Sequence, residues 1–266
     1  MRIRPLRPSD LRYFNIPAFP LDTRVWVMEK RLPIAYAGYA MAPGLPHLAD
    51  LYVYVMPAHR RRGYGSQLLA HVMSHIEEPT VTTLSAPVSH LSVPTAHFLH
   101  HHEFDVEHVE LELVCNLVEG EFSADPSLII AHGEPAAERM RQLYNDSFGG
   151  LPWYQPYEDA DEILNDLGVD GEILLWQHNG ESIGFVGVRY VRLVADIEPL
   201  GVIQPCQGKG IGQRLLGATL AYLQQIGCIE AQLAVWQQNK PAVQLYRKFG
   251  FRPKSQRIFM ARKIRE

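Results

Sequence analysis

Two short glycine-rich runs are the residues of this sequence whose types and spacing point most directly to chemistry. The run from Gln207 to Gly212 lies between the apolar stretch 200–203 and residues 213–226, whose apolar positions recur at helical spacing. Glycines allow successive backbone N–H groups to turn towards an anion, and the N-terminus of a following helix adds a partial positive charge. The run therefore predicts a phosphate-binding turn between a strand and a helix.

A second run of the same kind, Arg60 to Gly65, lies between the apolar residues 51–55 and the helix-like residues 68–76. Two strand, glycine-turn and helix units in one chain indicate an internal duplication. Neither run has the spacing G-x-G-x-x-G of dinucleotide-binding turns or G-x-x-x-x-G-K-[ST] of P-loops, and both fit [QR]-x-x-G-x-G instead. The arginines at 60–62 are either a solvated surface cluster or counter-charges for bound phosphates.

The stretch 239–251 follows a strand-like segment at 229–236 and has the features of a capped amphipathic helix. Asn239 can cap its N-terminus, proline is tolerated in its first turn, and glycine at position 250 favours its end. Four residues fall on one face of this helix: Ala242, Leu245, Tyr246 and Phe249.

These features together resemble the GNAT superfamily of N-acyltransferases. The pattern [QR]-x-x-G-x-G is similar to the family's acetyl-CoA pyrophosphate loop, and 239–251 is similar to its second signature, N-x-x-A-x-x-L-Y-x-K-x-G-F. Both signatures occur in the family's order in the second half of the chain, whereas the first half resembles the family more loosely. The resemblance implies an α/β protein of two tandem GNAT-like domains with mixed sheets, a degenerate one at 1–118 and a catalytic one at 128–266.

The resemblance also implies a function. We expect an acetyl-CoA-dependent N-acetyltransferase that acetylates a primary amine of a small molecule or a peptide, with acetyl-CoA as its cosubstrate. The alternative, from a different class, is a CoA-binding or regulatory interaction module without turnover, which the degenerate first half motivates. Transfer of an acyl group longer than acetyl stays open.

Catalytic residues are expected in the C-terminal domain. The resemblance implies Tyr246 as the general acid towards the CoA sulfur, and a tyrosine that only fills the core is the alternative. Counting back from Gln207, Asp196 takes the position at which several members of the family carry a catalytic glutamate, and Glu198 would share its strand face. A carboxylate acting through a water would be the general base, and ordinary carboxylates at the edge of a cleft are an equal alternative.

The matching positions of the first half carry no such groups. Aligning the two halves places Leu99 opposite Tyr246 and Ala49 opposite Asp196. Neither residue can donate or accept a proton through its side chain. We therefore expect the N-terminal domain to retain at most cofactor binding.

Cofactor binding is expected from both glycine turns and from the strand that enters the second one. In GNAT proteins this strand splays from its neighbour, which would leave a backbone N–H near Val202 facing the thioester oxygen. The cofactor-binding residues implied are Val202, Ile203, Gln207, Gly208, Lys209, Gly210, Ile211, Gly212, Asn239, Arg60, Arg61, Arg62, Gly63 and Gly65.

The composition favours a soluble protein with two domains. The chain has 266 residues, of which 47% are hydrophobic and 20% charged. A net charge of −4 gives no electrostatic basis for a nucleic-acid partner. Without an apolar run of membrane-spanning length or an apolar core of a signal peptide, we expect no membrane association and a cytoplasmic location. The three widely spaced cysteines predict reduced thiols rather than a zinc site or disulfides.

Four histidines lie close together at positions 97, 100, 101 and 102. His97 and His101 have the spacing of two ligands on one helix, but no further ligand pair has a matching spacing. We therefore favour a half-exposed helix face and expect no bound metal.

Strand-like and helix-like segments alternate in each half and predict a mixed α/β sheet. Residues 106–117 and 259–263 are expected to close the first and the second domain, respectively, and the polar segment 119–127 is expected to link them. The aromatic segment 151–157 would line an acceptor pocket or pack between the domains, and the sequence favours neither.

Overall fold

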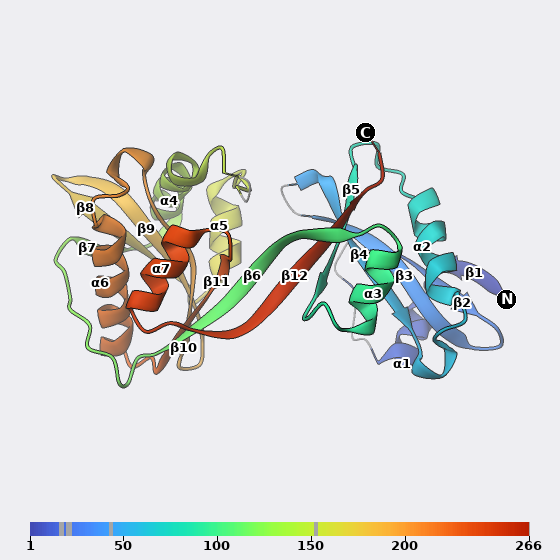
Figure 1. Ribbon diagram of the computed structural model, residues 1–266. Coiled ribbons are helices and arrows are strands. Elements are labelled where there is room, and N and C mark those ends of the chain that lie inside the picture. The colour runs from blue at the N-terminus through green and yellow to red at the C-terminus, as the bar shows by residue number, and fades with distance from the viewer. Residues whose placement is uncertain (16–18, 20–22, 43–44, 152–153, 266) are drawn as a thin grey trace. The chain divides into compact units, whose positions relative to one another are not determined.

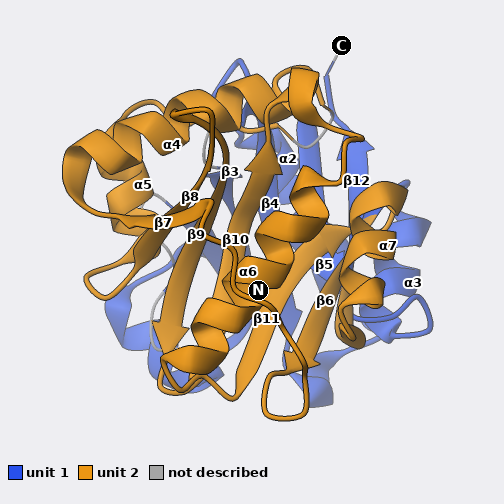
Figure 2. Cartoon of the chain, turned by 90° about the vertical axis from the view of Figure 1, so that its left-hand side faces the viewer, with its two compact units in different colours: residues 1–108, 257–266 blue, residues 109–256 orange. Residues whose placement is uncertain are grey.

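The computed structural model (Figure 1) describes residues 1–266 with the exception of 16–18, 20–22, 43–44, 152–153 and 266. The chain divides into two compact units (Figure 2). Unit 1 contains residues 1–108 and 257–266, and unit 2 contains residues 109–256. Each unit combines a mixed sheet with helices, so the predicted α/β class is confirmed.

Unit 1 has strands in the order β1-β2-β3-β4-β5-β12, and all neighbours are antiparallel except β4 and β5, which are parallel. Helix α2 packs on β3 and β4. The strands are β1 (Arg2–Pro5), β2 (Arg24–Glu29), β3 (Pro33–Ala42), β4 (Leu45–Val55), β5 (Thr83–Val88) and β12 (Arg252–Lys263), and the helices are α1 (Leu11–Phe14), α2 (Tyr64–Ser74) and α3 (Pro94–His101).

Unit 2 repeats this plan with the order β6-β11-β10-β9-β8-β7, in which β10 and β11 are the parallel pair. The strands are β6 (Asp105–Asn116), β7 (Leu128–Ala131), β8 (Glu172–His178), β9 (Glu181–Val191), β10 (Val194–Val202) and β11 (Glu230–Trp236), and the helices are α4 (Gly133–Phe148), α5 (Ala160–Leu167), α6 (Ile211–Gln225) and α7 (Lys240–Lys248).

The last strand of each half completes the sheet of the other unit. Strand β6 pairs with β11 in unit 2, where Leu113 lies opposite Leu233. The end of β12 pairs with β5 in unit 1, where Met260 lies opposite Ala86. The expectation that each strand closes its own half was therefore wrong. Alternating burial predicts a half-buried strand, but it does not specify the partner strand.

The segment 119–127, expected as a linker, lies within unit 2 and has no helix or strand. Arg214 of α6 forms an ion pair with Asp125 at 2.7 Å. The side-chain amide of Gln224 donates hydrogen bonds to the carbonyl oxygens of Leu117 and Gly120. These bonds attach the segment to the surface of α6.

Local sequence signals explain the turns that frame unit 2. Asn179 and Gly180 both have positive φ, 51° and 83°, which is the backbone of a type I′ turn between β8 and β9. Helix α7 begins as predicted, because the side-chain oxygen of Asn239 accepts a hydrogen bond from the N–H of Ala242. Gly250, with φ of 84°, follows the end of this helix.

The helices of unit 2 cover both faces of its sheet, with α6 and α7 on one face and α4 and α5 on the other (Figure 2). Alternate residues of β8 show this division. Leu174 and Trp176 belong to the core under α6 and α7, whereas Ile173 and Leu175 belong to the core under α4 and α5. Side chains from either face can therefore meet only where the sheet opens.

Among the described residues, no helix is both long and apolar enough to span a membrane. The three cysteines are free thiols in the structure. Cys115 and Cys228 are buried, and burial raises the pKa of each thiol.

Candidate active site

The parallel strands of unit 2 separate just before the glycine turn. Strands β10 and β11 pair only from Val194 to Asp196, so the later part of β10 has no partner on that side. On the other side, the N–H of Ile203 donates to the carbonyl oxygen of Ile183 in β9. Because hydrogen bonding alternates along an antiparallel strand, the N–H groups of residues 200 and 202 point into the opening.

The turn after β10 has the conformation expected of an anion cradle. Gly208 and Gly210 have φ of 73° and 80°, a region that side-chain-bearing residues rarely adopt. The backbone N–H groups of 208–213 have no acceptor among the described residues, and α6 starts without a side-chain cap. Gln207 closes the turn, since its amide donates to the carbonyl oxygen of Val202 at 2.8 Å. These free donors fit a pyrophosphate of the CoA type.

Helix α7 holds Tyr246 beside this opening. The ring is 7% exposed and lies 5.6 Å from the ring of Phe251. Burial raises the pKa of the Tyr246 hydroxyl above its ordinary value, and the negative charge of Glu198 raises it further. Tyr246 is therefore protonated at neutral pH, which is the state that a proton donor needs.

The two predicted carboxylates lie on β10 and share one cation. Asp196 lies opposite Arg189 of β9, and the guanidinium donates to its carboxylate at 2.8 Å. The same nitrogen lies 3.5 Å from the carboxylate of Glu198. The side chain of Asp196 is 22% exposed and that of Glu198 is 51% exposed. Both carboxylates are thus accessible to water, with Glu198 the less tightly held.

Arg189 was not identified from the sequence. An arginine in a strand of a hairpin has no motif of its own, and only the register of β9 against β10 places it beside Asp196. Burial lowers the pKa of its guanidinium, but the charges of Asp196 and Glu198 together outweigh burial and raise it. Arg189 therefore stays charged and fixes the direction of both side chains.

An aromatic cluster covers the sheet on the α4 side near Glu198. Tyr144 is its centre, and the rings of Phe148, Tyr157 and Phe185 lie 5.0, 4.9 and 6.2 Å from it. Burial is the main cause that raises the pKa values of Tyr144 and Tyr157; the charge of Asp166 is the next contributor at Tyr157, and that of Glu198 contributes less at both. The aromatic segment 151–157 thus contributes Tyr157 and Tyr154 to this wall, while residues 152–153 lie outside the described residues.

Unit 1 contains an equivalent opening, which forms a pocket of about 970 Å³. Its two parallel strands also separate early, because β4 and β5 pair only from Leu48 to Asp50. Arg60 takes the place of Gln207, since its guanidinium donates to the carbonyl oxygen of Val55 at 2.9 Å. Arg60, Arg61, Gly63 and Gly65 line the pocket, whereas Arg62 is exposed and is not among the lining residues.

Strand β10 contains a bulge that the sequence alignment of the two halves did not include. The register against β9 shifts between Ile197 and Leu200, so β10 has one more residue there than β4 has against β3. Counting the same number of residues back from Gln207 and from Arg60 therefore aligned Asp196 with a residue one position too early in β4.

The pairing of the strands shows which residue of β4 corresponds to Asp196. Asp196 is the last residue of β10 that pairs with β11, and it lies opposite Arg189 of β9. Asp50 is the last residue of β4 that pairs with β5, and it lies opposite Ala40 of β3. The alignment of Ala49 with Asp196 was therefore wrong, and the structural counterpart of Asp196 is Asp50.

The histidines of α3 and the one that follows it differ in their surroundings. His97 and His101 line the unit 1 pocket, and His102 shares a hydrogen bond with Ser66 at 2.8 Å. Within the described part of the chain, no group of three or more His, Cys, Asp or Glu side chains is placed to hold a metal ion.

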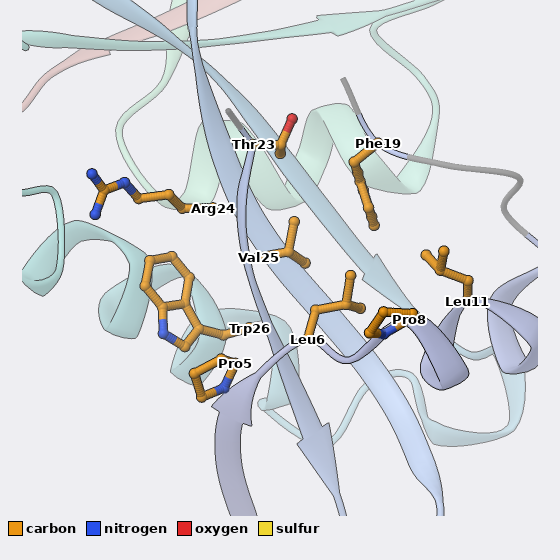
Figure 3. Close-up of a pocket in the computed structure, with 9 residues that line it drawn as sticks. All are labelled: Pro5, Leu6, Pro8, Leu11, Phe19, Thr23, Arg24, Val25 and Trp26. Atoms are coloured by element: carbon orange, nitrogen blue, oxygen red, sulfur yellow. The ribbon is translucent and has the colours of Figure 1, made fainter. Parts of the chain in front are cut away.

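A further hollow of unit 1, of about 510 Å³, lies beside β1 and β2 (Figure 3). Leu6, Pro8 and Val25 gather on one side of β2, whereas Arg24 and Trp26 extend from the other side. Arg24 forms ion pairs with Glu77 and Glu78. Among the described residues, the lining of this hollow has no carboxylate that could act as a base.

The chain matches the model of the acetyltransferase (GNAT) family twice, over residues 6–104 and 137–251. It is also similar to two proteins named mycothiol acetyltransferase. That of Stackebrandtia nassauensis is 26% identical over 229 residues, which are 77% of this chain and 71% of that protein. That of Saccharomonospora viridis is 27% identical over 230 residues, 77% of this chain and 70% of that protein. The tandem architecture expected from the sequence, similar to that of mycothiol synthase, agrees with these matches.

Solved structures share the fold over almost the whole chain. A GCN5-related N-acetyltransferase from Sphaerobacter thermophilus has a TM-score of 0.69 at 17% identity, covering 97% of this chain and 85% of that one. A tandem GNAT protein from the clavulanic acid biosynthesis pathway has a TM-score of 0.63 at 18% identity, covering 98% and 89%. At these identities the likeness concerns the fold.

Proposed function

This chain belongs to the acetyltransferase (GNAT) family, and we propose that its unit 2 transfers an acetyl group from acetyl-CoA to the primary amine of a small molecule. The observation that carries the proposal is the opening between β10 and β11. There the N–H groups of residues 200 and 202 have no partner strand, the glycine turn follows them, and Tyr246 belongs to the same core cluster as Val202. Glu198 stands close enough to Tyr246 to raise the pKa of its hydroxyl.

Each part of the opening has a role in this reaction. The free N–H groups of 208–213 bind the pyrophosphate of acetyl-CoA. The N–H of Val202 donates a hydrogen bond to the thioester oxygen and stabilises the negative charge that develops there. The amine nitrogen forms a bond to the carbonyl carbon, the C–S bond breaks, and Tyr246 donates its proton to the leaving sulfur.

The carboxylates remove the proton of the attacking amine. An alkyl amine with a pKa of about 10.4 is charged at pH 7, and making it neutral costs roughly 4 kcal/mol. Glu198, or Asp196 acting through a water, accepts this proton. Arg189 acts as a positioning residue, because it holds both carboxylates on the same side of β10.

The acceptor follows from the walls of the opening. Carboxylates at its edge attract a cationic amine, and the aromatic cluster around Tyr144 offers a flat apolar surface. The relatives named mycothiol acetyltransferase support a small-molecule acceptor rather than a protein.

The experiment is a comparison of Tyr246→Phe with the parent protein. Removing the hydroxyl keeps the ring that packs on Phe251, so the fold should be kept. We expect turnover with acetyl-CoA and a panel of primary amines to fall by at least tenfold, while calorimetric titration shows unchanged CoA binding. Tyr222→Phe is the matched control, because it removes a hydroxyl bound to Glu172 elsewhere in unit 2. An unchanged rate in Tyr246→Phe would remove this residue from the mechanism.

A further inference from the structure

One side of the unit 1 pocket presents backbone N–H groups in the same arrangement as the opening of unit 2. The N–H of Met56 donates to the carbonyl oxygen of Ile34, so the N–H groups of residues 53 and 55 point away from β3, towards the pocket. The N–H groups of 61–66 have no acceptor among the described residues, and α2 starts without a side-chain cap. The guanidinium of Arg60 lies over the ring of Tyr54 at 5.9 Å and adds positive charge to the turn.

The pocket also contains a carboxylate at the strand position that Asp196 occupies in unit 2. Asp50 is the only Asp or Glu among the described residues that line it, and it occupies the position that Asp196 occupies in unit 2. No ion pair of Asp50 is found in the described part of the chain, in contrast to the pairing of Asp196 with Arg189. Burial raises the pKa of the Asp50 carboxyl. A half-buried carboxylate without a counter-cation is a stronger base than a paired one.

An aromatic wall stands beside Asp50, as it does beside Glu198. Tyr36 follows the first paired residue of β3 and lies opposite Tyr54 of β4. It takes the position that Phe185, which lies opposite Gly201, takes on β9. The rings of Phe14, Phe19 and Tyr54 lie 5.0, 5.3 and 5.5 Å from it. Tyr52, also in the lining, is close enough to Asp50 for that charge to raise the pKa of its hydroxyl.

We infer that unit 1 is a second acyl-transfer site, in which Asp50 is the general base and the acceptor is a primary amine carried on a flat apolar group. The inference goes beyond the reaction proposed for unit 2, because it assigns a separate reaction centre to the first half of the chain. It rests on the cavity, the register of Asp50 and the aromatic wall.

The reaction at this site is balanced without a further reagent. The neutral amine nitrogen forms a bond to the thioester carbon of acetyl-CoA, the C–S bond breaks, and the sulfur leaves as a thiolate. Asp50 accepts one proton from the nitrogen, and the thiolate takes a proton from solvent. The products are the acetamide and CoA. Leu99, at the place of Tyr246, cannot supply the proton, so this site is slower than that of unit 2.

The test uses the full chain with unit 2 impaired at its proton donor and at one of its two carboxylates. The double variant Tyr246→Phe/Asp196→Asn is assayed with acetyl-CoA and tyramine, and amine-dependent release of free thiol is measured above the hydrolysis background. Asp50→Asn is then added to this double variant. Asp105→Asn, an exposed carboxylate of the same unit, is the matched addition. Calorimetric titration with CoA reports the number of binding sites in each protein.

We expect a residual amine-dependent rate in the double variant, a drop of at least tenfold on adding Asp50→Asn, and a change of less than twofold on adding Asp105→Asn. CoA titration should count two sites in every variant. Equal rates with and without Asp50, or no amine-dependent rate in the double variant, would overturn the inference. Failure of the unit 2 proposal would appear separately, as a parent rate that Tyr246→Phe leaves unchanged.

Discussion

A substitution at the C-terminal end of the chain should destabilise its N-terminal half. Met260 lies on β12, is 2% exposed and pairs with Ala86 of β5 in unit 1. Replacing a buried methionine with alanine removes its packing and leaves a cavity, at a cost of about 2–5 kcal/mol. A domain has a total stability of only about 5–15 kcal/mol, so the loss is a large fraction of that of unit 1.

The assay is hydrogen exchange of backbone amides measured by mass spectrometry on peptides of each unit. A loss of about 2.8 kcal/mol corresponds to exchange about 100-fold faster for amides that exchange by unfolding, since each 1.4 kcal/mol is a factor of ten. In Met260→Ala, we expect this acceleration in peptides of β2 to β5. Peptides of α6 and β10 should be unchanged.

The reciprocal change is Leu113→Ala on β6. Leu113 is 1% exposed and lies opposite Leu233 in unit 2, so its loss should accelerate exchange in unit 2 although it belongs to the first half of the chain. Lys263→Ala, at an exposed position of β12, is the control and should change stability by no more than about 0.5 kcal/mol. Faster exchange of α6 peptides in Met260→Ala would refute the exchange of strands between the halves.

Two further predictions concern the openings. Gly212→Glu should weaken CoA binding to unit 2 by at least tenfold in calorimetric titration, because it places a carboxylate among the free N–H groups. Gly212→Ala is the control and should bind CoA normally, since its Cβ would meet only Leu245 and Val202 at ordinary distances of 3.8 and 3.9 Å. Asp50→Asn should raise the melting temperature at pH 7–8, because the folded-state pKa of Asp50 is raised and its ionised form is penalised by burial. The gain should shrink as the pH falls through the raised pKa and vanish below the ordinary value of 3.8; a gain that persists at lower pH would exclude the carboxylate as its cause.

The pH dependence involves every titratable group that lines the pocket. Among the described residues that line the cavity, Asp50 is the only carboxylate, and the other titratable groups are tyrosines, histidines and arginines. They are Tyr36, Tyr52, Tyr54, Tyr64, His59, His97, His101, Arg60, Arg61 and Arg257. All of these groups are present in both proteins, so the difference in melting temperature between variant and parent isolates Asp50.

The sequence determined the local parts of the site. Glycine alone tolerates the positive φ of Gly208 and Gly210, and Asn239 caps α7 through its own side chain. These features depend on interactions within a few residues, which is why the glycine turns and the helix that holds Tyr246 were predicted with bounds correct to within a few residues. The family followed from the same local motifs.

Only the tertiary structure decided which strands pair and which carboxylates correspond. Apolar and polar residues alternate along β6 and β12, and this pattern is compatible with the edge of either sheet. It could therefore not reveal that each strand completes the other unit. A bulge adds one residue without changing the pattern around it, and the count from Gln207 therefore missed Asp50. Arg189 reaches Asp196 only through cross-strand register, which depends on partners distant in sequence and is not written in either strand alone.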